Sequence, residues 1–342
     1  MGGSGFPGVL SRPHVVLGCM FVILLTAVPP AGAAATTGAA SPVAATTVAA
    51  TTGSSAGPAL WQPVWSDSFG GPAGAGLGSR QWRYQTGTGI FGTGEIETMT
   101  SSRSNVALDG RGDLDITALD QGGVWTSGRV QTTESFAAPA GGQLMVTAQI
   151  RQPDPADGLG YWPAFWMIGP GTWPGTGELD IMEDVNGLSE HSGTAHCGNL
   201  TQSNGDGTLG PCHEPVGISS GLQPCGGCQD GYHTYSIVLD RRLPAREQIR
   251  WYLDGQRFFG VTESQVGAAA WAQAYDHGLS VLFDLAIGGG YPNSDCGCTT
   301  PTAQTSSGAT MSVRSVAVYA SGPGALFGAA ASTTGASHHA SR

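Results

Sequence analysis

Short runs of apolar residues, several with polar residues at alternate positions, fill the chain between about residue 61 and about residue 319, and Gly, Pro, Asn and Asp separate them. Such runs predict β-strands, most of them buried on one face only. The clearest runs are 113–119, 143–150, 235–239, 249–253, 279–285 and 311–319. Asp254-Gly255 stands between two runs and predicts a tight β-hairpin. Many short strands with frequent turns favour an all-β sandwich or jelly roll.

Helical periodicity is nearly absent from the sequence. Only 263–275 could hold a short helix, and a chain with 55 glycines in 342 residues is a poor helix former. No internal repeat is evident, which counts against a propeller or a solenoid. The pattern therefore predicts one large β-domain.

The segment 173–186, WPGTGELDIMEDVN, concentrates acidic residues in a chain with only 11% charged residues. Leu179 and Ile181 alternate with Glu178 and Asp180, so the two acids should share one face of a strand. Strict alternation sends Glu183 to the opposite face.

A β-bulge near Met182 would return Glu183 to the face of Glu178 and Asp180. Asp184, the fourth acid, is then expected off this face, in solvent or in a turn. Carboxylates that share a site raise one another's pKa, so an acid and a base can coexist there. Paired carboxylates of this kind perform glycoside hydrolysis. The alternatives are a solvated strand face or a structural calcium cluster.

The two ends of the chain have compositions unlike the middle. Residues 1–33 resemble a secretory signal peptide, because Arg12 and His14 precede the apolar run Val15–Val28 and the small residues Ala-Gly-Ala follow it. A run of 14 residues is short for a membrane span, which needs about 20, although an uncleaved anchor is the alternative. Residues 34–60 are predicted to be a disordered Ala/Thr-rich linker, 61–322 the catalytic domain and 323–342 a disordered tail. We therefore expect a secreted, extracellular protein.

Six of the seven cysteines lie beyond the predicted signal, and three disulfides are expected in an oxidising compartment. They are Cys197, Cys212, Cys225, Cys228, Cys296 and Cys298. The sequence leaves the pairing open. Cys225-Gly-Gly-Cys228 also resembles a redox or zinc half-site, but no second such pair follows, and a structural bridge is the better interpretation.

The net charge of −11 argues against nucleic acid or an anionic membrane as a partner. Nine tryptophans instead favour a ligand with flat apolar faces. Trp162 and Trp173 stand beside prolines and the acidic segment, and aromatic rings stack on the faces of sugars. Trp166 could equally be a core residue. His196 is expected on the next strand, across a hairpin from Glu183, where it could bind substrate or tune an acid.

The segment YWPAFWMIGPGTWPGTGELDIMED closely resembles the catalytic core of glycoside hydrolase family 16, in particular its laminarinase-like endo-β-1,3-glucanases. Further similar segments follow in the family's order over about residues 61–320. They include Asn105-Val106, Thr126–Val130, HSGTAHCG, Gly231–Tyr235, Ile249–Gly255 and Leu285–Gly289. The resemblance implies a jelly-roll sandwich of two antiparallel sheets with a concave substrate cleft.

The resemblance also implies residue roles. Glu178 is the expected nucleophile, Glu183 the general acid/base and Asp180 the acid between them, in a retaining double displacement. Seven residues are expected around the sugar: Trp162, Trp173, His196, Asn105, Arg129, Trp166 and Tyr291. No cofactor is required, no catalytic metal is expected, and the protein is predicted to act as a monomer.

The sequence departs from the family pattern in three places. Arg314 stands where many members carry an Asp that binds a structural calcium, so that calcium is doubtful. Tyr291 replaces a usual Trp, which could change a sugar subsite. Loops with additional cysteines at 197–228 and 296–298 could reshape the ends of the cleft.

The expected function is therefore a secreted endo-glycosidase for β-1,3 or mixed β-1,3-1,4 glucan. An endo-β-1,3-galactanase or a transglycosylase on the same scaffold is an alternative within enzymes. A non-catalytic β-glucan-binding module is the alternative in a different class, although both Glu178 and Glu183 are present. A structural or adhesive surface protein has only the Ala/Thr-rich linker in its favour.

Overall fold

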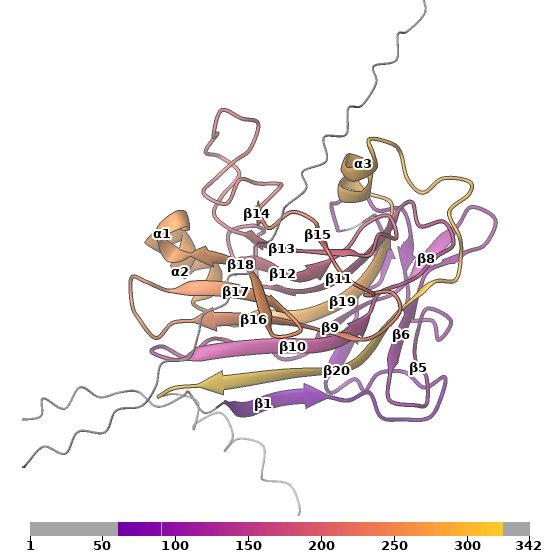
Figure 1. Ribbon diagram of the computed structural model, residues 1–342, viewed down its shortest axis with the longest axis horizontal. Coiled ribbons are helices and arrows are strands. Elements are labelled where there is room, and N and C mark those ends of the chain that lie inside the picture. Colours follow the sequence, from indigo (N-terminus) through magenta and orange to yellow (C-terminus); the bar gives the residue numbers. More distant parts are fainter. Residues whose placement is uncertain (1–60, 90, 324–342) are drawn as a thin grey trace, which may run out of the picture. The chain divides into compact units, whose positions relative to one another are not determined.

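The computed structural model describes residues 61–89 and 91–323, and these form a sandwich of two antiparallel eight-stranded sheets (Figure 1). The first sheet has the order β18-β17-β16-β10-β20-β6-β5, with β1 also paired to β20. Its strands are β1 (Gln62–Asp67), β5 (Val106–Leu108), β6 (Leu114–Thr117), β10 (Gln143–Arg151), β16 (His233–Asp240), β17 (Gln248–Leu253), β18 (Gln256–Thr262) and β20 (Thr310–Ser321).

The second sheet has the order β14-β13-β12-β11-β19-β9-β2, with β15 also paired to β13. Its strands are β2 (Trp82–Tyr84), β9 (Arg129–Thr132), β11 (Tyr161–Ile168), β12 (Glu178–Glu183), β13 (Glu190–His196), β14 (Ile218–Ser219), β15 (Gln223–Pro224) and β19 (Ser280–Ile287). A small third sheet joins β3 (Gly87–Thr88), β4 (Thr98–Met99), β8 (Trp125–Ser127) and β7 (Leu119–Asp120). The predicted two-sheet sandwich is confirmed.

The core lies between the two large sheets, where their apolar faces meet. Phe165 on β11 and Phe283 on β19 are direct register partners, and their rings stack at 4.8 Å. Both side chains are fully buried, and each such burial contributes roughly 1.5–3 kcal/mol. The opposite face of these strands is therefore free to carry polar side chains.

Turns and helices largely follow the sequence. Asp254 and Gly255 both adopt positive φ, 48° and 76°, and close the predicted hairpin between β17 and β18. The predicted helix at 263–275 is two short helices, α1 (Glu263–Val266) and α2 (Ala268–Tyr275), interrupted at Gly267, whose φ is 91°. A further helix, α3 (Gly290–Cys296), was not predicted, because its sequence GYPNSDC contains Gly and Pro. The predicted signal peptide and linker, and the predicted tail except residue 323, lie outside the described residues.

Candidate active site

The acidic strand β12 contains the predicted β-bulge. Its partner β11 pairs Trp166 with Asp180 and Phe165 with Met182, which leaves Ile181 as one extra residue. Ile181 and Met182 are both fully buried in the core. The bulge thus resets the alternation, and Glu178, Asp180 and Glu183 come to lie on the outer face of the second sheet.

A tryptophan from the opposite sheet holds the bulge in place. Trp251 on β17 is fully buried, and its Nε1 donates a 2.7 Å hydrogen bond to the backbone oxygen of Asp180. Gly193 on β13 leaves room for this ring, because a Cβ there would come within 2.5 Å of Trp251 Cδ1. The carbonyl at the bulge therefore has a partner that reaches it through the core.

Glu183 lies beside an aromatic wall. Trp162 Nε1 donates a 2.9 Å hydrogen bond to Glu183 Oε1. The Tyr291 ring packs edge-on against Trp162 with centroids 5.8 Å apart, and its hydroxyl lies 3.3 Å from Ser192 Oγ. Only 8% of Glu183 is exposed, so its carboxyl meets little water.

His196 lies at the Glu178 end of the strand, and its predicted position opposite Glu183 is wrong. β13 pairs His196 with Glu178, whereas Ser192 is opposite Glu183. The connection between β12 and β13 is six residues long, and this length sets the register that the sequence could not reveal. His196 Nε2 lies 3.3 Å from Asp180 Oδ2 and 3.9 Å from Glu178 Oε1.

The other ring nitrogen of His196 contacts an acid that the sequence did not indicate. His196 Nδ1 is 2.6 Å from Glu214 Oε2, and Glu214 is fully buried. Burial disfavours the imidazolium, but the contacts with Asp180 and Glu214 outweigh it and hold the pKa of His196 well above its usual value. The ring of Trp173 lies 5.6 Å from that of His196.

The two outer acids have different electrostatic surroundings. Burial, and then the charge of Asp180, raises the pKa of Glu178 to about 8, while His196 and Arg129 act in the opposite direction. Burial and Asp180 likewise raise the pKa of Glu183 well above its usual value, and a hydrogen bond from the neutral Trp162 opposes them. The charges of His196 and Arg129 favour the ionised form of Glu178, so we expect it to ionise before Glu183.

Arg129 supplies positive charge on the same face. It pairs in register with Asp284, and its guanidinium lies 3.9 Å from the ring centroid of Phe91 and 4.5 Å from that of Trp166. Trp166 is 7% exposed and donates a 2.6 Å hydrogen bond to Asp284 Oδ1. Burial raises the pKa of Asp284 to about 6. The ring of Trp166 thus packs against Arg129, and its hydrogen bond to Asp284 fixes it beside Asp180.

Asn105 is the one expected sugar ligand whose side chain is fully engaged elsewhere. It is 3% exposed and bonds Thr100 Oγ1, the backbone oxygen of Thr117 and Thr126 Oγ1. Within the part of the chain that the structure describes, no hydrogen bond or ion pair joins it to the acids. The structure brings the other six expected ligands near the acidic strand, but not Asn105.

Asp184 is wholly buried, contrary to the expectation of solvent or a turn. Because Glu183 faces outward, the next residue points into the sandwich. Neither Asp184 carboxyl oxygen has a hydrogen-bond partner among the described residues, and burial raises its pKa to about 9. Burial therefore favours the protonated form of Asp184.

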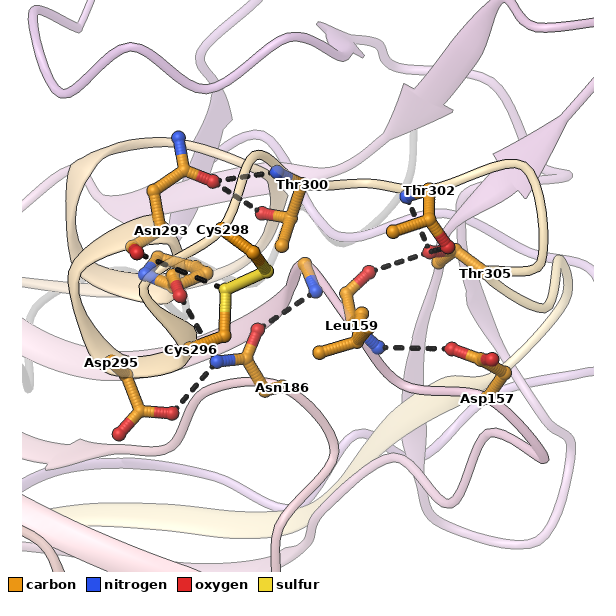
Figure 2. Close-up of a disulfide and its surroundings, with 12 residues drawn as sticks. Asp157, Leu159, Asn186, Asn293, Asp295, Cys296, Cys298, Thr300, Thr302 and Thr305 are labelled. Atoms are coloured by element: carbon orange, nitrogen blue, oxygen red, sulfur yellow. Dashed lines mark hydrogen bonds between the residues drawn. A yellow bond between two sulfur atoms is a disulfide. The ribbon is translucent and has the colours of Figure 1, made fainter. Parts of the chain in front are cut away.

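Helix α3, which contains Tyr291, and the segment after it are held by side-chain amides and a disulfide (Figure 2). Cys296 pairs with Cys298, Asn186 Nδ2 donates to Asp295 Oδ2 at 2.8 Å, and Asn293 Oδ1 accepts bonds from Thr300. The other disulfides are Cys197–Cys212 and Cys225–Cys228. The three expected bridges are present, each between cysteines close in sequence.

A pocket of about 320 Å³ is lined in part by Trp173. Its lining also includes Pro174, Asn199, Leu200 and Gln273. An aromatic ring, apolar edges and amides are the groups that commonly contact carbohydrate. None of the three acids lines this pocket, which Trp173 shares with the site.

Two groups of described residues bring three potential metal ligands within 4.8 Å of one another. One is Glu178, Asp180 and His196, which belong to the acidic site itself. The other is Cys225, Cys228 and His233, but its cysteines are joined in a disulfide.

At the position of the family's calcium ligand, the guanidinium of Arg314 lies 3.7 Å from the ring centroid of Tyr232, and its Nε is 3.4 Å from Asp113 Oδ1. A cation already occupies this position and cannot ligate another. These residues therefore do not fit a calcium ion.

Residues 98–210 match a family described as "XgeA-like, catalytic GH16 domain". The chain is similar to an endo-1,3-beta-glucanase from Streptomyces sioyaensis, with 43% identity and a TM-score of 0.72, over 78% of this chain and 99% of that one. The chain belongs to glycoside hydrolase family 16. This family 16 chain is also similar to an endo-beta-1,3-glucanase from Pyrococcus furiosus. The two are 29% identical with a TM-score of 0.60, over 77% of this chain and 96% of that one.

The family 16 chain is also 30% identical over 286 residues to glucan endo-1,3-beta-glucosidase A1 of Niallia circulans. The match covers 75% of this chain but only 37% of that relative, so the chain spans little more than a third of the relative's length. Among the described residues, no helix has the length and apolar character needed to cross a membrane.

Two acids of the family 16 site were missed at the sequence level. Asp284 was visible as a lone charge in the apolar run 279–285, and that isolation was the available signal. Glu214 lies in a polar loop 18 residues after His196, and nothing in its local sequence indicates burial against a histidine.

Proposed function

We propose that the chain is a retaining endo-glycosidase that hydrolyses β-1,3 or mixed β-1,3-1,4 glucan. The observation that carries the proposal is the bulge at Ile181, which places Glu178 and Glu183 on one face with Asp180 between them. Membership of family 16 supports the reaction class. The Streptomyces and Pyrococcus relatives are endo-1,3-beta-glucanases, which supports β-1,3-glucan as the substrate class.

In the proposed reaction, Glu178 attacks the anomeric carbon while Glu183 protonates the departing glycosidic oxygen. A covalent glycosyl-enzyme forms, and Glu183, now a carboxylate, accepts a proton from the water that releases it. The positive charges of His196 and Arg129 favour the ionised nucleophile. The low exposure of Glu183 and the negative charge of Asp180 favour its protonated form before attack.

Sugar binding is assigned to the aromatic side chains around the acids. Trp162 and Tyr291 form the wall beside Glu183, and Trp173 lies beside His196 and the adjoining pocket. Arg129, Trp166 and Asn105 remain proposed ligands, the last with every side-chain hydrogen bond directed to protein. We also propose that the protein is secreted and acts as a monomer, and the disulfides support an oxidising compartment.

The purified protein should be incubated with laminarin, lichenan, curdlan, β-1,3-galactan, agarose and xyloglucan. We expect laminarin to be shortened to oligosaccharides whose new reducing ends first appear as the β-anomer, as a double displacement requires. Release of the α-anomer first would contradict retention. Binding of laminarin without cleavage of any polymer would instead support a recognition module, and cleavage of galactan alone would change the substrate class.

A further inference from the structure

The acid Glu214 stands behind His196, on the side away from the acidic strand. Its Oε2 lies 2.6 Å from His196 Nδ1, and its Oε1 accepts a 2.8 Å hydrogen bond from the backbone N–H of Cys197. Both carboxyl oxygens are therefore engaged, and the whole side chain is buried. A fully buried carboxylate is costly unless charge and hydrogen bonds compensate for lost hydration. Here the groups in contact with the carboxylate are the His196 ring and the Cys197 N–H.

The loop 198–217 brings Glu214 to this position. The Cys197–Cys212 disulfide closes most of the loop, and Glu214 exchanges two backbone hydrogen bonds with Leu209, at 2.7 and 2.8 Å. Gly217, with φ of 77°, passes so close to the histidine that a Cβ would lie 2.8 Å from His196 Cε1. Much of the loop surface is exposed, yet its one glutamate points inward.

We propose that Glu214 is a positioning residue, which holds His196 as an imidazolium with Nε2 directed at Asp180 and Glu178. The inference rests on the proposed hydrolase function of the same site. A neutral histidine with Nδ1 facing a carboxylate would donate from Nδ1 and leave Nε2 without a proton, directed at two further acids. Protonation at both nitrogens directs one N–H at Glu214 and the other at Asp180, with Glu178 Oε1 3.9 Å from the same nitrogen. The buried charge on loop 198–217 thereby supports an ionised nucleophile on β12.

The titratable groups that face His196 are acids and one phenol. Three acids face the ring from β12, namely Glu178, Asp180 and Glu183, and Glu214 faces it from the loop. The hydroxyl of Tyr275 on α2 donates a 2.9 Å hydrogen bond to the backbone oxygen of His196. Removing the charge of Glu214 removes one of the two close carboxylate contacts of the ring. We therefore expect His196 to lose its proton at lower pH in a Glu214→Gln variant.

The first test is the pH profile of laminarin hydrolysis by Glu214→Gln. The amide can still accept from Cys197, so the loop is retained while the charge is lost. We expect kcat to fall about tenfold to a hundredfold with little change in KM, and the basic limb of the profile to move to lower pH. Asp206→Asn, an exposed change on the same loop, is the matched control and should keep the wild-type profile.

A double-mutant cycle separates positioning from general loop damage. If Glu214 acts through His196, then Glu214→Gln should add almost nothing to the loss already caused by His196→Gln. Additive losses would overturn the proposal. Wild-type kcat and pH limbs in Glu214→Gln would overturn it as well.

NMR titration of the His196 ring in the wild-type protein keeps the proposal testable if Glu214→Gln does not fold. We expect both ring nitrogens to remain protonated at pH 7.5, and loss of the proton near pH 6.5 would refute the inference. This measurement does not depend on turnover. If laminarin and the other glucans are not cleaved, the proposed function fails, whereas the titration still decides whether His196 is an imidazolium.

Discussion

Glu178 and Glu183 are the same amino acid, five positions apart on one strand, in unlike surroundings. Glu178 is close to His196 and Arg129, whereas Glu183 accepts a hydrogen bond from Trp162 and has no cation as its direct partner. Their roles follow from these neighbours and not from the side chains themselves. The sequence predicts the pair and the shared face, but Glu214 becomes visible only when a distant loop folds back.

Replacing Glu178 by Gln tests the nucleophile. The amide has nearly the same shape but cannot form the glycosyl ester, so laminarin hydrolysis should fall by at least about a thousandfold without loss of folding. Hydrolysis is measured by reducing-sugar release and folding by circular dichroism. Glu134→Gln, at an exposed position, should match the wild type. Activity near the wild-type level in the Glu178 variant would remove Glu178 from the mechanism.

Asp184 should make stability depend on pH. Its pKa rises from 3.8 in the unfolded chain to about 9 in the folded one, so the folded state binds the extra proton. Its contribution to stability is fully present below pH 3.8 and is lost as the pH rises towards 9. Asp184→Asn keeps the shape and cannot ionise. Between pH 5 and pH 8 the free energy of denaturant unfolding should decline less in this variant than in the wild type or Asp206→Asn, by up to about 4 kcal/mol, because each pH unit in this range is worth about 1.4 kcal/mol. An equal decline in all three proteins would show that Asp184 does not carry the effect.

At the scale of elements, strand β12 and its bulge could be predicted from the sequence, but the register of β13 and the helix α3 could not. The period of two in Glu178–Ile181 breaks at Met182, and a bulge there is required if Glu183 is to share the face of Glu178 and Asp180. The register of β13 was not predictable, because loop length and geometry set it. α3 was missed since its stability comes from Asn186, Thr300 and a disulfide and not from local helix propensity (Figure 2).

Trp251→Phe tests whether the core tryptophan fixes the bulge. The change removes the donor to Asp180 O and leaves a small void, so unfolding free energy should fall by about 2–4 kcal/mol. We also expect kcat to fall several-fold, because the acids lose their fixed spacing. Trp271→Phe is the matched control, since it too removes a buried indole hydrogen bond, to Glu247. The control should lose stability but keep kcat, and unchanged kcat in both variants would disconnect Trp251 from the site.

At the scale of the whole molecule, the strand runs predicted the sandwich because each buries one face against the other sheet. What the sequence left open depends on contacts between distant segments, such as Trp251 with Asp180 and Arg314 with Asp113. Arg314 and Asp113 lie more than 200 residues apart in the chain. The sequence around Arg314 indicates only that the Asp expected there from the family pattern is missing.

We propose that the fold is stable without calcium at the Arg314 position. The melting temperature in EDTA should therefore lie within about 1 °C of that in millimolar CaCl₂, because a ligand that does not bind the native state cannot shift unfolding. The guanidinium of Arg314 instead contacts Tyr232 and Asp113, contacts worth roughly 1 kcal/mol at a half-exposed site. A rise of several degrees in the melting temperature on adding calcium would show that the protein binds the ion, either elsewhere or despite Arg314.

The three disulfides join residues only 15, 3 and 2 positions apart, and none links one large sheet to the other. Cross-links over such short loops restrict the unfolded chain little, and the longest contributes at most about 3 kcal/mol. The sandwich can consequently assemble by strand pairing before any cysteine is oxidised. Production in a reducing host should then yield soluble β-rich protein whose catalytic loops are incomplete, and later oxidation in the tube should restore turnover without a refolding step.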